Sequence, residues 1–124
     1  MEFSATSHSL DGNAYVVEVE GELDLATVGD LQDALDAPLR DDSSRVIVDL
    51  EGCGFIDSTG IRTLVSVHSA LGGRDGNDRA LAIVSGENEV RRVLGITGID
   101  ALIPIFGDRE AALSFLSSSS SSSS

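Results

Sequence analysis

The opening of the chain is marked by a period-two pattern of apolar and polar side chains. Residues 14–20 alternate, with apolar side chains on one face and the acids Glu18 and Glu20 on the other. This period predicts a half-solvated strand near an edge of a sheet. Residues 3–8 alternate more weakly, and we expect them to pair with this strand as a hairpin through a turn at residues 11–13.

Two unbroken apolar runs predict the interior of the sheet. Residues 46–48 and 81–84 are rich in β-branched side chains, which suits strands that are covered on both faces. Residues 102–106 also resemble a strand, but Pro104 cannot donate a ladder hydrogen bond. We therefore expect this last run at an edge.

Helical periodicity predicts four helices between and after these strands. They are expected over residues 27–38, 58–71, 87–96 and from 108 onwards. Thr27 and Asp30 form a capping box that begins the first helix, and Pro38 is expected to end it. Asp108 is expected to cap the last helix, in which Phe115 is among the side chains that point inward.

The order of these elements predicts the fold class. Strands that alternate with helices pair in parallel through right-handed crossovers. We therefore expect one α/β domain over residues 1–116, with a small, mostly parallel β-sheet, an N-terminal antiparallel hairpin and about four flanking helices. Residues 117–124 are all serine and bury no apolar side chain, so this tail is predicted to be disordered.

Composition and charge narrow the range of functions. The 124 residues include 8 basic and 21 acidic side chains, a net charge of -13, which disfavours binding to nucleic acid or to an anionic membrane. No apolar run is long enough for membrane insertion, and the N-terminus lacks the pattern of a signal peptide. We expect a cytoplasmic protein whose partners are proteins. All the basic residues are arginine, and the absence of lysine excludes a Walker phosphate loop or a Schiff-base lysine.

Candidate catalytic residues are few. Ser58 cannot be a nucleophile elbow, because Ile56 stands where that motif needs glycine. His8 and His68 have no partner at the spacing of a catalytic triad, and Cys53 belongs to no thiol motif. These side chains also provide no spaced set of metal ligands. We therefore expect no enzymatic activity, cofactor or metal site.

One short motif combines hydroxyl and acidic groups where the longest helix is expected to begin. Asp57, Ser58, Thr59 and Gly60 follow a buried strand, expected to end at Leu50, and a glycine-rich loop. Either of the first two residues can cap the helix, which places Ser58 among unpaired N–H groups at the positive helix end. A phosphate there would add about -1.5 to -2 charges, and Gly60 would let another chain approach closely. Alternatively, the motif is only a good helix start.

Four segments in order resemble the STAS domain family, which is typified by bacterial anti-sigma factor antagonists. They are residues 19–24, with a Gly-Glu-Leu-Asp element, the central strand at 46–50, the phosphorylation motif at 55–60 and a third-helix segment at 90–99. The resemblance extends over roughly residues 2–116.

The resemblance implies a switch rather than an enzyme. The unphosphorylated protein would bind an anti-sigma factor that is a GHKL-type serine kinase, and so release a sigma factor. Phosphorylation of Ser58 would end the binding, and a PP2C-type phosphatase would restore it. Asp24 and Asp57 correspond to acidic positions that meet the kinase, Thr59 is an alternative target, and Gly60 completes the partner-binding set. Alternatively, the same fold implies an adaptor subunit of a lipid or solute transporter.

Overall fold

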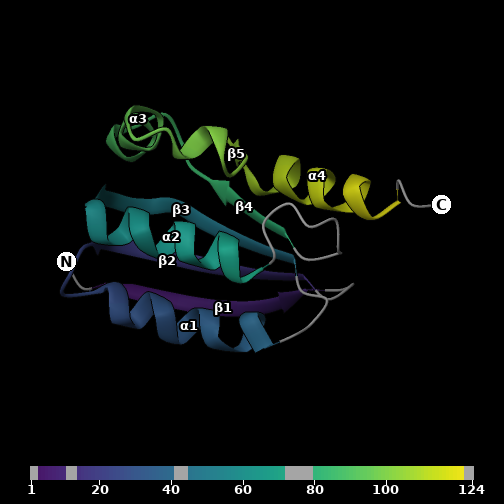
Figure 1. Cartoon of the computed structure of the whole chain (residues 1–124), viewed down its shortest axis with the longest axis horizontal. Coiled ribbons are helices and arrows are strands. Elements are labelled where there is room, and N and C mark those ends of the chain that lie inside the picture. The colour runs from purple at the N-terminus through teal and green to yellow at the C-terminus, as the bar shows by residue number, and fades with distance from the viewer. Residues whose placement is uncertain (1–2, 11–13, 41–44, 72–79, 122–124) are drawn as a thin grey trace.

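The sheet contains five strands among the described residues. The computed structural model describes residues 3–10, 14–40, 45–71 and 80–121, with side chains as far as residue 116. The strands are β1 (Ser4–Leu10), β2 (Ala14–Leu23), β3 (Arg45–Ile56), β4 (Ala80–Val84) and β5 (Ile105–Phe106). They lie in the order β1-β2-β3-β4-β5, as Figure 1 shows for most of the sheet. The pair β1–β2 is antiparallel and the other pairs are parallel.

This arrangement confirms the predicted fold class and the expected N-terminal hairpin. The apolar runs at residues 46–48 and 81–84 lie in β3 and β4, inside the sheet, and the run that contains Pro104 leads into the edge strand β5. The turn expected at residues 11–13 lies outside the described residues.

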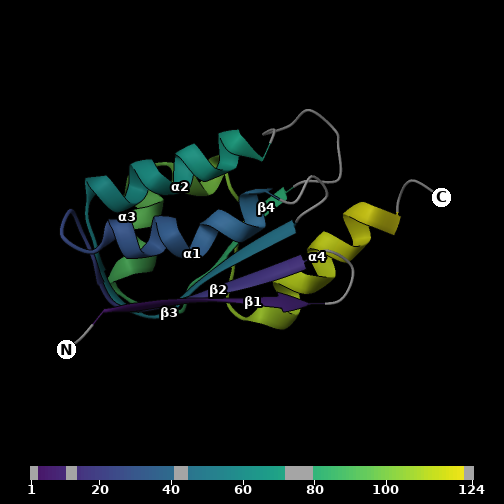
Figure 2. The same cartoon turned by 90° about the horizontal axis from the view of Figure 1, so that it is seen from below.

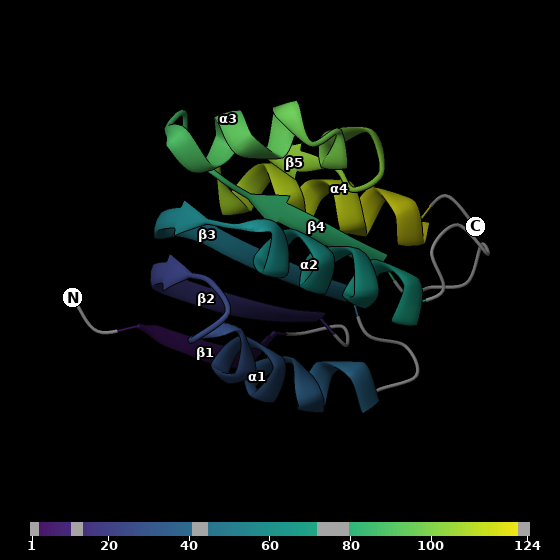
Figure 3. The same ribbon diagram turned by 60° about the vertical axis from the view of Figure 1, so that its left-hand side comes forward.

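Helices cover both faces of the sheet. They are α1 (Val28–Arg40), α2 (Ser58–Ala70), α3 (Glu89–Ile96) and α4 (Arg109–Ser121), with a short 3-10 turn at Ile99–Ala101. Figures 2 and 3 show α1 and α2 side by side on one face, while α4 lies on the opposite side of the sheet. None of the helices in the described ranges is long and apolar enough to cross a bilayer.

The two faces have cores of unequal size because successive side chains of a strand point to opposite sides. The larger core packs Val17, Val48 and Leu50 against Leu31 of α1 and Leu64 of α2. The smaller core contains side chains of β2, β3 and β4 that pack against α4: Val16, Ile47, Ala82, Val84, Ala112 and Leu116. The sheet is therefore covered on both faces at β3 and β4, as the unbroken apolar runs predict.

Strand β3 is longer than expected. It does not end at Leu50 but continues to Ile56, so the glycine-rich stretch belongs to the strand. Its pairing with β2 shifts register twice, and each shift gives β3 one extra residue. The two irregularities explain why Leu50, Cys53 and Ile56, three residues apart, all reach the larger core.

The helix boundaries differ from the sequence-based expectations by one or two residues at the end of α2 and the start of α3, and for a physical reason at the ends of α1 and α4. Pro38 does not end α1; it is buried inside the helix, which continues to Arg40. Proline at this position removes one backbone hydrogen bond and crowds the carbonyl four residues earlier, and burial of its ring offsets part of that cost. Helix α4 continues to Ser121, although disorder was expected from residue 117. Extending a formed helix is far easier than nucleating one, which explains the added turns. The domain boundary at residue 116 stays a prediction.

The last helix begins as expected, but one of its side chains does not point fully inward. Asp108 accepts a hydrogen bond from the backbone N–H of Ala111 at 2.8 Å. Phe115 was expected in the core, yet it is 41% exposed. Its ring packs on that of Phe106, with the centroids 5.4 Å apart. The edge position of β5 explains this exposure, since no further strand of the described sheet covers the pair.

Candidate phosphorylation and docking site

The candidate site lies where β2 and β3 end. These strands are parallel, so their carboxyl ends meet at one edge of the sheet. Leu23 pairs with Ile56, and the backbone N–H of Asp57 donates to the carbonyl of Leu23 at 3.2 Å. This contact brings the segment that begins at Asp24 next to the segment that begins at Asp57. The structure therefore brings together the predicted acidic residues and Ser58.

Helix α2 begins with Asp57 as its cap. The Asp57 carboxylate accepts hydrogen bonds from the N–H groups of Thr59 at 2.9 Å and Gly60 at 3.1 Å. The carbonyl of Asp57 accepts from the N–H of Ile61 at 3.0 Å. Ser58 is thus the first residue of the helix. Two of the N–H groups that were expected to surround a phosphate, those of Thr59 and Gly60, are already bonded to the Asp57 carboxylate.

The Ser58 side chain faces solvent. It is exposed, whereas Thr59 is half-buried, and no hydrogen bond to the Ser58 hydroxyl is found within the described ranges. The backbone carbonyl of Thr59 also accepts a hydrogen bond from the hydroxyl of Thr63 at 2.9 Å. Of the two neighbouring hydroxyl groups, that of Ser58 is the more accessible to another protein.

Gly60 has a packing role that the sequence did not predict. It is buried, and a Cβ atom at this position would lie 2.8 Å from Cγ1 of Ile56 and 3.0 Å from the side chain of Leu23. The absence of a side chain lets the first turn of α2 pack directly on the ends of β2 and β3. Gly60 therefore fixes the position of Ser58 by close packing, and its place in the partner-binding set stays a prediction.

We expect Gly60→Val to lower the free energy of unfolding by about 1–3 kcal/mol, because the new side chain overpacks the contact with Leu23 and Ile56. Urea denaturation followed by circular dichroism measures the change. Gly29→Val is the matched control: a Cβ at Gly29, in the first turn of α1, meets nothing within 4 Å. A Gly60 variant as stable as this control would contradict the packing role.

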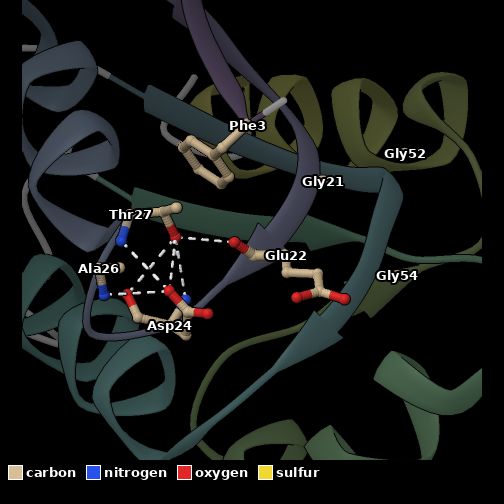
Figure 4. A pocket seen from close by; sticks show the side chains of 8 residues that line it. All are labelled: Phe3, Gly21, Glu22, Asp24, Ala26, Thr27, Gly52 and Gly54. Carbon is tan, nitrogen blue, oxygen red and sulfur yellow. Dashed lines mark hydrogen bonds between the residues drawn. The ribbon is translucent and has the colours of Figure 1, made fainter. Parts of the chain in front are cut away.

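A hydrogen-bonded turn holds Asp24 in place. One carboxylate oxygen accepts from the N–H groups of Ala26 at 3.0 Å and Thr27 at 3.2 Å. The hydroxyl of Thr27 accepts from the N–H of Asp24 at 3.0 Å and donates to the carbonyl of Glu22 at 2.7 Å. Thr27 therefore closes the turn after β2, as Figure 4 shows, instead of forming the expected capping box with Asp30, whose N–H bonds to the Thr27 carbonyl.

A hollow of about 360 Å³ lies beside this turn. Figure 4 shows the residues that line it, from the chain start, the end of β2 and the second half of β3. They are Phe3, Gly21, Glu22, Asp24, Ala26, Thr27, Gly52 and Gly54. Sequence reasoning missed this hollow. Three glycines contribute to it, and Gly21, with φ of 102°, has a backbone conformation that favours glycine.

The sequence assigns no chemistry to Cys53, His8 or His68. Cys53 is buried and donates to the carbonyl of Phe55 at 3.1 Å, and burial raises the pKa of its thiol. His8 contacts Glu18 at 3.2 Å on the exposed side of the hairpin, and His68 is half-buried on α2. In the part of the chain that the structure describes, no cluster of three or more His, Cys, Asp or Glu residues is placed to hold a metal ion.

Solved structures define the class of this fold. An anti-sigma factor antagonist from Mycobacterium paratuberculosis superimposes with a TM-score of 0.81 and 26% identity, over 93% of this chain and 94% of that chain. The Bacillus cell fate determinant SpoIIAA in its phosphorylated form superimposes with a TM-score of 0.66 and 17% identity, over 91% and 99% of the two chains. The second likeness shows the fold alone.

Sequence comparison then gives the family. The STAS domain model matches residues 7–112, and the chain belongs to the STAS domain family. An anti-sigma-B factor antagonist from Staphylococcus aureus is 37% identical over 92 residues, which cover 73% of this chain and 82% of that relative. A Staphylococcus epidermidis protein of the same name is 35% identical over 92 residues, with the same coverage. These findings confirm the family resemblance.

Proposed function

We propose that this chain is an anti-sigma factor antagonist controlled by phosphorylation. Its unphosphorylated form binds an anti-sigma factor that is also a GHKL-type serine kinase, and this binding frees a sigma factor. A phosphate on Ser58 ends the binding, and a PP2C-type phosphatase removes it. The name of the Staphylococcus aureus relative supports the antagonist role over that of a transporter adaptor. The observation that carries the switch is the exposed Ser58 side chain at the first position of α2.

The surroundings of Ser58 explain how a phosphate acts without a change of fold. Asp57 already accepts from the amides of Thr59 and Gly60, so a phosphate on Ser58 finds these groups occupied. The new charge therefore stays in solvent beside the Asp57 carboxylate. A partner that docks closely has to strip water from this dianion, and that desolvation opposes binding. A loss of hundredfold to ten-thousandfold in affinity requires about 2.8–5.5 kcal/mol.

The test is incubation of the protein with GHKL-type anti-sigma kinases of the same genome and ATP, followed by peptide mass spectrometry. We expect one phosphate, on Ser58, because its side chain is exposed while that of Thr59 is half-buried. Ser58→Ala should abolish the modification, and Thr59→Ala should retain it. Phosphate on Thr59 in the unaltered protein, or no modification by any of these kinases, would contradict the proposal.

A further inference from the structure

Two large apolar side chains are exposed beside the hollow. Leu25 is 76% exposed and Phe55 is 44% exposed. Leu25 stands between Asp24 and Ala26, which both line the hollow, and Phe55 follows Gly54, which also lines it. The pairing of β2 and β3 also sets Phe55 next to Glu22, another lining residue, so both apolar residues are immediate neighbours of residues that line the hollow.

This pair differs from the other exposed apolar side chains. Single exposed apolar residues are normal on a protein surface, whereas a group of them beside a hollow marks a contact surface. The other large ones among the described residues lie on separate elements: Leu10 on β1, Ile96 on α3, Leu102 after the 3-10 turn and Phe115 on α4. Among the large exposed apolar residues of the described ranges, Leu25 and Phe55 are the two that adjoin lining residues of the hollow.

Two glycines of β3 line the hollow, and only one of them is required by packing. A Cβ atom on Gly52 would lie 2.9 Å from the Glu20 side chain, so the fold itself favours glycine there. A Cβ atom on Gly54 would meet nothing within 4 Å, and the φ of Gly54 is not positive. The fold therefore tolerates a side chain at Gly54, and the effect of its absence is that the hollow stays open.

The charge around the hollow indicates the chemistry of the partner. Glu22 and Asp24 line it, Asp57 lies at the adjacent helix start, and the whole chain carries a net charge of -13. A second copy of the chain would bring the same charge to the same surface. A partner with basic groups around an apolar contact is complementary to it.

We propose that Leu25 and Phe55 form the apolar docking surface for the anti-sigma factor, which places apolar side chains in and beside the hollow and basic groups against Glu22 and Asp24. This inference rests on the proposed function, because it names the contacts that Ser58 controls. Burial of the two side chains supplies affinity, and the nearby Ser58 decides whether the partner can come close enough to bury them.

The experiment is calorimetric titration with the kinase that phosphorylates Ser58. We expect Leu25→Ala and Phe55→Ala each to weaken binding by about tenfold to a hundredfold, as truncation of a buried apolar contact does. Ile96→Ala is the matched control, since Ile96 is 74% exposed on α3, and its affinity should stay within about twofold of the unaltered protein. Thermal unfolding of the three variants should coincide.

Gly54→Val gives an independent test of the hollow. The added side chain should weaken binding by about tenfold or more without lowering the unfolding temperature, because it fills space that a partner needs. Added salt should weaken binding of the unaltered protein and of Leu25→Ala by the same factor, since the leucine contact carries no charge.

The outcomes separate the two proposals. If the unaltered protein binds but the Leu25, Phe55 and Gly54 variants bind as tightly as Ile96→Ala, the docking surface is wrong and the proposed function stands. If the unaltered protein binds none of the anti-sigma kinases, both are wrong.

Discussion

Replacing Ser58 with Asp is expected to weaken binding to the anti-sigma kinase by at least about a hundredfold, while Ser58→Ala keeps the affinity within about threefold. Ser58 is exposed and makes no side-chain hydrogen bond within the described ranges, so alanine removes no contact of the free protein. Aspartate places a second carboxylate next to Asp57, where docking must desolvate both. Calorimetric titration of each variant with the kinase measures the difference.

A charge on the same helix away from the docking surface is the matched control. Ser66 is exposed on α2, two turns beyond Ser58. Ser66→Asp adds the same charge to the same helix, and its affinity should change by less than about threefold, because exposed charges at that separation are largely screened. Equal affinities of Ser58→Asp and Ser58→Ala would show that the site is not a switch.

The second large effect is expected on stability. Arg109, at the start of α4, donates to the Asp49 carboxylate at 2.6 Å and also to Glu18. Asp49 is only 5% exposed, so Arg109→Met leaves a buried carboxylate without its cation. Breaking a buried ion pair costs about 3–5 kcal/mol; because the Arg109 side chain is 40% exposed, we expect a smaller loss, about 2–3 kcal/mol. Urea denaturation near neutral pH measures it.

A double variant tests whether the unpaired charge is the cause. Asp49→Asn combined with Arg109→Met removes both charges and should recover part of the stability that the single variant loses. A loss below about 0.5 kcal/mol for Arg109→Met would contradict the role of the pair, since that is the range of ordinary surface substitutions.

The pH dependence of the free energy of unfolding tests the contact between Arg109 and Glu18 separately. The hydrogen bond from Arg109 lowers the pKa of Glu18 below its usual value. A lowered pKa means that the stabilisation is complete above the pKa of the unfolded chain, about 4.3, and is lost as the pH falls through the lower pKa of the folded protein. Arg109→Met should therefore lose less stability than the unaltered protein over this acidic range.

The strand prediction succeeded where one periodicity holds through a strand and was wrong where it changes. Residues 14–20 all lie in β2, but the strand is not half-solvated throughout, because Val16, on the same face as Glu18 and Glu20, is buried in the smaller core. Strand β3 alternates only as far as Leu50; its two extra residues then put Cys53 and Ile56 on the same side as Leu50. The sequence predicted this strand from its apolar run, which ends at Leu50, and the glycine-rich stretch with the two extra residues was interpreted as a loop.

The site was partly predictable because its motif is local. The sequence placed Ser58 at the start of a helix, and the structure agrees. It left the choice of cap open between Asp57 and Ser58, since that choice depends on backbone angles that residue types do not determine. The hollow was beyond sequence reasoning, because it forms only when the pairing of the strands brings Phe3 near Gly52, some fifty positions later.

The Asp57 cap also affects how the phosphate proposed on Ser58 is removed. A phosphate drawn into the amides of its own helix would be sheltered from hydrolysis, and resetting the protein would require the helix start to open. Since Asp57 holds those amides, a phosphate on Ser58 would remain as reachable as the hydroxyl it replaced. Phosphorylation and dephosphorylation would then take place at the same exposed surface, and the rate of phosphate removal would depend on the phosphatase rather than on any motion of this protein.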